Sequence, residues 1–131
     1  AKLLPEYDVR PPDPELPAEA LSGGNQQKVI VARELSRAPK LILACNPTRG
    51  LDVGAAAGVH ARLVSAAREQ KAAVLLISSD LDEVLALSDR VAVLYRGTLS
   101  DTWPRGVSKE EVGRAMVGAG ASAKSEVRSA N

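Results

Sequence analysis

The chain has 131 residues, the length of a single domain, and 45% of them are hydrophobic, as in ordinary globular proteins. Its 17 basic and 16 acidic residues give a net charge of +1, so the charge balance predicts neither an acidic nor a basic partner. A single cysteine excludes an intrachain disulfide framework. No apolar run is long enough to cross a membrane, so we expect any membrane association to go through a partner.

The first 20 residues predict an irregular lead-in, because five of the eight prolines lie there and proline removes a backbone hydrogen-bond donor. A helix is expected from about Gly23 to Ala38. Ser22 precedes it as a candidate N-cap, and Pro39 is expected to end it.

Two short apolar runs, 41–45 and 73–77, predict buried strands, and a helix of about 54–70 is expected between them. A short helix over 81–87 and a third buried strand over 91–95 follow. Because helices and apolar strands alternate, we expect an α/β fold with a mostly parallel sheet flanked by helices.

The last part of the chain predicts smaller elements. Arg96-Gly97 is the expected turn into a short antiparallel hairpin near residues 98–101. Ser108 is the candidate N-cap of a last helix. Residues 118–131 are mostly small and polar, which predicts a disordered tail.

The strongest functional signal is the segment Leu-Ser-Gly-Gly-Asn-Gln-Gln-Lys at residues 21–28, where the first long helix is expected to begin. Glycine lets a ligand approach the backbone closely, and a helix N-terminus offers free N–H groups that suit a phosphate. The hydroxyl of Ser22 adds a further donor. A capped helix after a flexible turn would have the same local sequence, so this segment alone does not decide between the two interpretations.

Further motifs follow in a definite order. Pro-Thr-Arg-Gly-Leu-Asp occupies residues 47–52, Ser-Ser-Asp-Leu-Asp-Glu-Val occupies 78–84, and Ser-Asp-Arg-Val occupies 88–91. This order and spacing resemble the C-terminal half of the nucleotide-binding domains of ABC transporters, over roughly residues 15–117. The wording of Gly-Gly-Asn-Gln-Gln-Lys at 23–28 and of Pro-Thr-Arg-Gly-Leu-Asp at 47–52 is most similar to the second such domain of ATPases from simple-sugar and nucleoside importers.

The resemblance implies a partial P-loop NTPase fold. It makes residues 1–20 the end of the family's helical subdomain and residues 21–117 the C-terminal part of the nucleotide-binding domain. In the family, the segment equivalent to 21–28 is the signature motif, which contacts the γ-phosphate of an ATP molecule held by the opposite domain of a head-to-tail dimer. The resemblance therefore implies ATP and Mg²⁺ as cofactors, both held mainly by the partner domain. The residues that it assigns to the γ-phosphate are Ser22, Gly23, Gly24, Asn25 and Gln26.

Several positions depart from the family pattern. The usual residue after the two glycines is Gln, and this chain has Asn25. The family's Walker B strand ends in an Asp that helps to hold Mg²⁺ and a Glu that polarises water, and these places hold Cys45 and Asn46. A thiol is a poor ligand for Mg²⁺, and an amide cannot accept a proton from water. The family's switch histidine falls on Ser79. We therefore expect a weakened or inactive hydrolytic site, although each replacement could also be a tolerated substitution.

Asp52 matches the family's D-loop, which crosses the dimer interface and couples the two sites. The same residue is also a candidate N-cap for the helix that follows, and the two roles are compatible.

The phosphate-binding sequence Gly-x-x-x-x-Gly-Lys-Ser/Thr occurs nowhere in the 131 residues. That loop surrounds the phosphates with backbone N–H groups, and the resemblance places it before residue 1. We therefore expect the chain to be a fragment of a longer product or a truncated reading frame. Alone, it is expected to bind nucleotide weakly and to hydrolyse none.

The leading hypothesis is an ATP-binding component of an importer for sugars or nucleosides. It would be cytoplasmic and peripheral at the inner face of the membrane, with a second nucleotide-binding domain and permease subunits as partners and no nucleic acid. One alternative is a truncated, non-catalytic interaction module, whose unpaired strand edges and exposed apolar surface would promote aggregation or dimerisation. Another is a soluble ABC ATPase of DNA repair or translation, which shares the signature motif. The wording of the motifs and the lack of a basic patch count against this last alternative.

Overall fold

The computed structural model describes residues 2–119, which divide between Ser78 and Ser79 into two compact units. The predicted disordered tail lies almost wholly outside the described residues, since 120–131 are not among them. The described part of the chain contains no helix with the length and apolar character that a membrane span requires.

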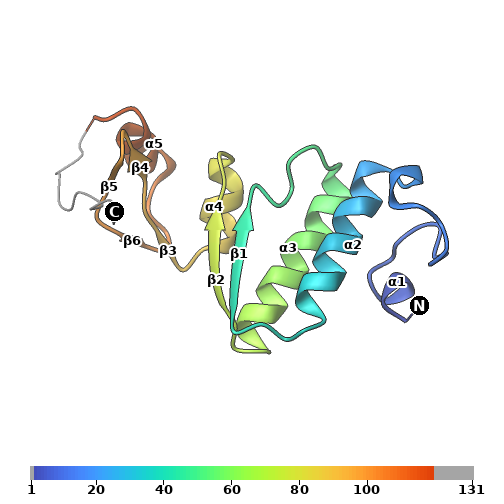
Figure 1. Cartoon of the computed structure of the whole chain (residues 1–131). Coiled ribbons are helices and arrows are strands. Elements are labelled where there is room, and N and C mark those ends of the chain that lie inside the picture. Colours follow the sequence, from blue (N-terminus) through green and yellow to red (C-terminus); the bar gives the residue numbers. More distant parts are fainter. Residues whose placement is uncertain (1, 120–131) are drawn as a thin grey trace, which may run out of the picture. The chain divides into compact units, whose positions relative to one another are not determined.

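The first unit is built around a parallel pair of strands. β1 (Leu41–Cys45) and β2 (Ala73–Ile77) have the predicted bounds and pair in register from Leu41 with Ala73 to Cys45 with Ile77. α3 (Val53–Arg68) connects them, close to the predicted range. Parallel neighbours require such a crossover helix, so β1, α3 and β2 form a βαβ unit (Figure 1).

α2 (Gly23–Leu35) begins where predicted, and the Ser22 hydroxyl accepts a bond from the N–H of Asn25 as its N-cap. The helix ends three residues before Ala38, which has a positive φ of 46°. A residue that precedes proline is disfavoured in the helical region, so Pro39 ends the helix earlier than predicted.

α2 and α3 pack on one face of the parallel pair. Val31 of α2 and Val59 and Leu63 of α3 contact the inward side chains of both strands. A second small cluster joins the far ends of the two helices through Leu35 and Ala66, and Ala66 is fully buried. The inward strand residues are Ile42, Ala44, Val74 and Leu76.

The opposite face of the parallel pair is exposed, so the prediction of fully buried strands was wrong for six of their ten residues. Leu41 and Leu43 are 67% and 65% exposed, and Leu75 and Ile77 are 55% and 48% exposed. Side chains alternate between the two faces of a strand, and the two helices cover only one face. The continuous apolar sequence is typical of strands covered on both faces.

The lead-in is less irregular than predicted. α1 (Leu3–Glu6) forms one helical turn and Ala18–Ala20 forms a 3₁₀ turn. Pro5 is tolerated because the first turn of a helix has no use for its missing N–H. Between these turns, residues 10–17 contain no helix or strand, as predicted.

The second unit contains α4 (Leu81–Leu87), with the predicted bounds, and short antiparallel pairs. The predicted third strand, 91–95, is instead two separate segments, β3 (Arg90–Val91) and β4 (Leu94–Tyr95). They pair antiparallel with β6 (Trp103–Pro104) and β5 (Thr98–Leu99), respectively. The interruption falls at Val93, whose N–H donates to the hydroxyl of Ser100 instead of to a backbone carbonyl.

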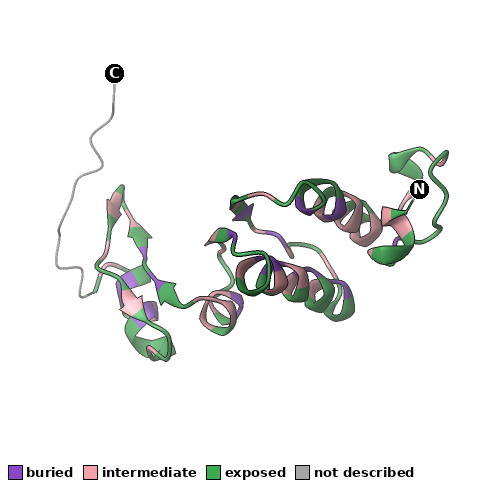
Figure 2. Ribbon diagram, turned by 90° about the horizontal axis from the view of Figure 1, so that it is seen from below, coloured by how far each residue is buried: buried purple, intermediate pink, exposed green. Residues whose placement is uncertain are grey.

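The predicted hairpin and last helix are present. Arg96 and Gly97 connect β4 to β5 with φ values of 47° and 78°, the positive values typical of a two-residue hairpin turn. α5 (Lys109–Met116) is capped by Ser108, whose hydroxyl accepts from the N–H of Glu111 at 3.2 Å. The core of this unit, coloured by burial in Figure 2, consists of Val91, Val93, Val112 and Ala115.

Candidate functional site

The carboxyl end of β1 and the N-termini of α2 and α3 lie at the same end of the first unit (Figure 1). A hydrogen bond links α2 to the loop after β1, since Gln27 Nε2 donates to the carbonyl of Pro47 at 2.8 Å. Gly24 also lies close to α3, because a Cβ added to it would be 3.7 Å from Cβ of Ala55. We call this end, formed by residues 21–27 and 46–55, the loop end. Ligands of parallel sheets bind beyond the carboxyl ends of the strands, so the loop end is the candidate site.

The start of α2 is open to an incoming ligand. Ser22 and Gly23 are exposed and Gly24 is half-buried. A Cβ added to Gly23 would meet nothing within 4 Å beyond its chain neighbours and the backbone of its own helix, and Gly23 has helical backbone angles, so neither packing nor backbone conformation requires a glycine there. The first N–H groups of a helix have no acceptor within it. Those of Gly23 and Gly24 therefore remain suited to an external anion.

The two polar residues that follow the glycines make different contacts. Gln26 Nε2 turns back to donate to the carbonyl of Leu21 at 2.9 Å. Asn25 bridges two segments, because its Nδ2 donates to Ser22 Oγ at 3.0 Å and its Oδ1 accepts from the backbone N–H of Arg10 at 2.9 Å. The contact of either side chain with a phosphate remains a prediction.

Cys45 and Asn46 follow each other where β1 ends. The N–H of Asn46 donates to the carbonyl of Ile77 at 2.7 Å, which extends the pairing of the strands by one bond. Asn46 has a φ of 44°, and asparagine tolerates this left-handed conformation better than most residues. Its Nδ2 lies 3.8 Å from the Sγ of Cys45, which is exposed.

The donors at the end of β1 do not fit a magnesium ion. Mg²⁺ prefers carboxylate, carbonyl and water oxygens, and a thiol beside an amide does not provide such a set. No cluster of three His, Cys, Asp or Glu side chains suited to a metal occurs within residues 2–119.

Asp52 has the predicted structural role. Its Oδ1 accepts from the N–H of Ala55 at 2.9 Å and caps α3, which starts at the loop end. Asp52 is exposed, and its proposed contact across a dimer interface remains a prediction. Ser79 is also exposed and is the first residue of the second unit, and its place at the family's switch position remains a prediction as well.

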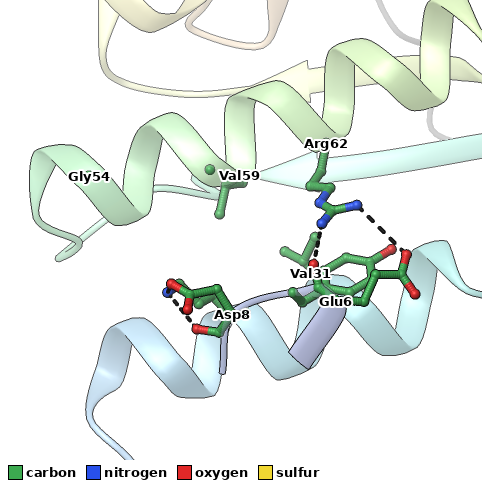
Figure 3. Close-up of a pocket in the computed structure, with 9 residues that line it drawn as sticks. Glu6, Asp8, Val31, Gly54, Val59 and Arg62 are labelled. Atoms are coloured by element: carbon green, nitrogen blue, oxygen red, sulfur yellow. Dashed lines mark hydrogen bonds and ion pairs between the residues drawn. The ribbon is translucent and has the colours of Figure 1, made fainter. Parts of the chain in front are cut away.

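An anchor that no sequence pattern indicated joins the lead-in to the two long helices (Figure 3). Lys28 Nζ of α2 donates to the carbonyl and the carboxylate of Asp8 at 2.8 and 3.1 Å. The guanidinium of Arg62 on α3 lies 4.2 Å from the ring centroid of Tyr7 and donates to the carbonyl of Glu6. The side chain of Arg10, and then that of Lys28, holds the pKa of the Asp8 carboxyl below its ordinary value.

No protein-family model matches the chain. It is 49% identical over 117 residues to the guanosine import ATP-binding protein NupO of Bacillus subtilis, which covers 88% of this chain and 23% of that protein. It is 48% identical to the nucleoside import ATP-binding protein NupA of Lactococcus lactis subsp. cremoris, over 89% of this chain and 23% of that protein. It is 42% identical to the glucose import ATP-binding protein TsgD13 of Haloferax volcanii, over 96% of this chain and 24% of that protein. The chain thus spans less than a quarter of the length of these relatives.

Solved structures share the fold. The ATP-binding subunit of an ABC transporter superposes with a TM-score of 0.72 at 23% identity, over 88% of this chain and 52% of that one. A dimeric ATP-binding cassette in a post-hydrolysis state, bound to ADP and phosphate, superposes with a TM-score of 0.70 at 24% identity, over 82% of this chain and 46% of that one. These similarities show that the chain has the architecture of part of a nucleotide-binding domain.

Proposed function

Because the chain belongs to the ABC ATPase family and matches the C-terminal part of its import members, we propose that it is the ATP-binding component, or part of that component, of an importer for sugars or nucleosides. The names of its relatives support this substrate class, since they include guanosine, nucleoside and glucose importers. They also favour an importer over an ATPase of DNA repair or translation.

The loop end would supply half of an ATP site. In this proposal the Ser22 hydroxyl and the N–H groups of Gly23 and Gly24 donate to the γ-phosphate of an ATP molecule held by a second nucleotide-binding domain. The observation that carries the proposal is the exposed start of α2, where Gly23 has no internal reason to be glycine. Donors placed in advance against a phosphate bind it and stabilise the charge that develops during its transfer.

The chain's own hydrolytic residues would be degenerate. Asn46 stands where the family has a general base, and an amide cannot accept the proton of an attacking water. Ser79 cannot carry the charge of the family's switch histidine. Mg²⁺ would be held by the partner, because Cys45 and Asn46 do not fit it. One productive site would remain in the dimer, with Ser22 to Gly24 on one side and the partner's phosphate loop on the other, and with Asp52 at the interface.

The proposed partners are a second nucleotide-binding domain, arranged head to tail, and the permease subunits of the importer. A dimer is also the state of the ATP-binding cassette with the fold described above. The proposed location is the cytoplasmic face of the membrane, where the permease would hold the protein peripherally. No role for nucleic acid is proposed.

The proposal is tested by assembling the chain with a partner domain that carries an intact phosphate loop and measuring phosphate release from ATP. Ser22→Arg places a long cation where the γ-phosphate should lie and is expected to reduce the turnover number more than tenfold. Ser36→Arg is the matched control, since Ser36 is exposed at the other end of α2 and bonds only locally, to the carbonyl of Arg33. Equal turnover in the Ser22→Arg and unchanged assemblies would contradict the proposal.

One observation favours a second candidate, a non-catalytic interaction module. The exposed face of β1 and β2 presents four large apolar side chains, those of Leu41, Leu43, Leu75 and Ile77, and contiguous apolar surface marks a site of association. This candidate predicts that the assembly shows the same ATPase activity with and without this chain, while the chain still binds its partner.

A further inference from the structure

We propose that Asn25 is a positioning residue that directs the hydroxyl hydrogen of Ser22 toward the bound phosphate. This inference rests on the proposed function, because it concerns the serine that would contact ATP. It assigns a task to the residue at which the chain departs from the glutamine usual in its family.

The side-chain oxygen of Ser22 accepts two hydrogen bonds from Asn25. Its Oγ accepts from Nδ2 of Asn25 at 3.0 Å and from the backbone N–H of Asn25 at 3.4 Å. A hydroxyl oxygen has two lone pairs and one hydrogen. Since Asn25 faces both lone pairs, the hydroxyl hydrogen points away from Asn25. Ser22 is exposed, so this hydrogen is directed toward solvent, where a phosphate oxygen can accept it.

The orientation of the Asn25 amide follows from its other partner. The backbone N–H of Arg10 lies 2.9 Å from Oδ1 of Asn25, and an N–H group can only donate. The atom that faces Arg10 must therefore be the carbonyl oxygen of the amide, which leaves the NH₂ group facing Ser22. A rotated amide would place its NH₂ against the N–H of Arg10 and its oxygen against Ser22, where it would draw the hydroxyl hydrogen away from the phosphate.

The position of Arg10 is in turn set by the lead-in anchor. Val9 is 1% exposed, and its N–H donates to the carbonyl of Leu4 at 2.8 Å. On the other side of Val9, Asp8 is bonded to Lys28, one turn after Asn25 on α2. Figure 3 shows Asp8 and Glu6 held against the two helices, with Arg62 reaching Glu6 from α3. Because Val9 is buried and its neighbours are bonded, the N–H of Arg10 is presented to Asn25 at a defined place.

The proposal is tested by a double-mutant cycle between residues 22 and 25 in the assembled ATPase. Ser22→Ala removes the hydroxyl, and Asn25→Ala removes the group that orients it. When Ser22 is present, Asn25→Ala is expected to lower the turnover number by about three- to tenfold and to change KM for ATP by less than that. In the Ser22→Ala background it is expected to change the turnover number by less than about 1.5-fold, because two residues that act as a unit are not additive.

The affinity for ADP distinguishes a positioning role from a structural one, because a variant that damaged the structure of the site would also bind ADP more weakly. ADP has no γ-phosphate, so Asn25→Ala should not change the affinity of the assembly for ADP. Asn25→Leu is the second variant, since leucine has nearly the shape of asparagine and makes no hydrogen bond. It should reproduce the kinetic effect even if alanine perturbs the start of α2, and thermal unfolding checks that both variants fold.

Gln27→Ala is the matched control for loss of an amide from the same helix, because Gln27 bonds to Pro47 and not to Ser22. Whatever its effect on turnover, that effect should be the same with and without the Ser22 hydroxyl. An equal effect of Asn25→Ala in the two backgrounds, or no effect in either, would overturn the positioning role and leave the proposed function standing. An unchanged turnover in Ser22→Ala would instead overturn the proposed function and, with it, the inference.

Discussion

The two units of the chain differ in the elements and the candidate site residues that they contain. The first unit contains long helices, a parallel pair of strands and every candidate site residue except Ser79, and it leaves one apolar sheet face exposed. The second unit contains two-residue strands and short helices around a small core of Val91, Val93, Val112 and Ala115. The first unit therefore holds the residues of the proposed ATP contact next to an uncovered apolar face, whereas the second unit holds a small core and only one of the candidate residues.

The largest expected effect is the loss of stability when a core residue of either unit is truncated. Leu63→Ala, between α2, α3 and the strands, is expected to destabilise the first unit by about 3 kcal/mol, from the lost methylene groups and the cavity left behind. Val112→Ala should cost the second unit roughly 2 kcal/mol, because it deletes two methyl groups at about 0.8 kcal/mol each and leaves a smaller cavity. Urea unfolding with hydrogen exchange measures both losses. A larger loss for Val112→Ala would reverse this ranking of the two cores.

A smaller effect concerns the exposed face of the parallel pair. Leu43 and Leu75 are register partners on that face, so Leu43→Lys with Leu75→Lys places two charges at its centre. We expect the double variant of residues 1–131 to self-associate at least about tenfold more weakly than the unchanged chain, since apolar patches drive association and charges oppose it.

The control for this variant is Leu94→Lys in the second unit, where Leu94 is 68% exposed. It should change self-association little. Sedimentation velocity at several concentrations measures the effect, and equal behaviour of the two variants would mean that the sheet face is not the associating surface.

The smallest expected changes in stability come from replacing one glycine in each unit. Gly23→Ala and Gly113→Ala each introduce a methyl group that meets no atom within 4 Å. Gly113 lies inside α5, so its replacement should stabilise the second unit by up to about 1 kcal/mol and leave ATP turnover unchanged. Gly23→Ala should alter stability by only about a few tenths of a kcal/mol, because Gly23 lies at the start of its helix. The same substitution should lower the turnover number, because the added methyl group crowds the phosphate. Thermal unfolding and phosphate release measure the two readouts, and a turnover that falls with Gly113→Ala but not with Gly23→Ala would contradict the assignment of the site to the first unit.

Local signals predicted the elements near the candidate site well. The bounds of β1, β2 and α4 agree with the predicted ranges, because apolar runs and the polar or proline residues around them define these elements locally. Ser22, Asp52 and Ser108 all cap helices as their residue types predict.

Predictions that depended on distant neighbours were less successful. The third strand is divided because Ser100, seven residues after Val93, takes a backbone bond that a ladder would use. The sheet of the first unit is exposed on one face because α2 and α3 both pack on the other face, which composition does not reveal. The anchor of the lead-in joins Asp8 to Lys28 across 20 residues, and no periodic pattern connects such a pair.

By itself, the sequence determined where the parallel strands lie, where the longer helices begin, which residues cap them and which family the chain resembles, because these depend on local spacing and on the wording of short motifs. Only the tertiary structure decided that Asn25 faces both Ser22 and Arg10, that Gly23 stands in open space, and that one face of the parallel strand pair is uncovered. The physical reason is that a hydrogen bond or an exposed face depends on which distant groups folding brings together, and a local sequence pattern carries no record of them.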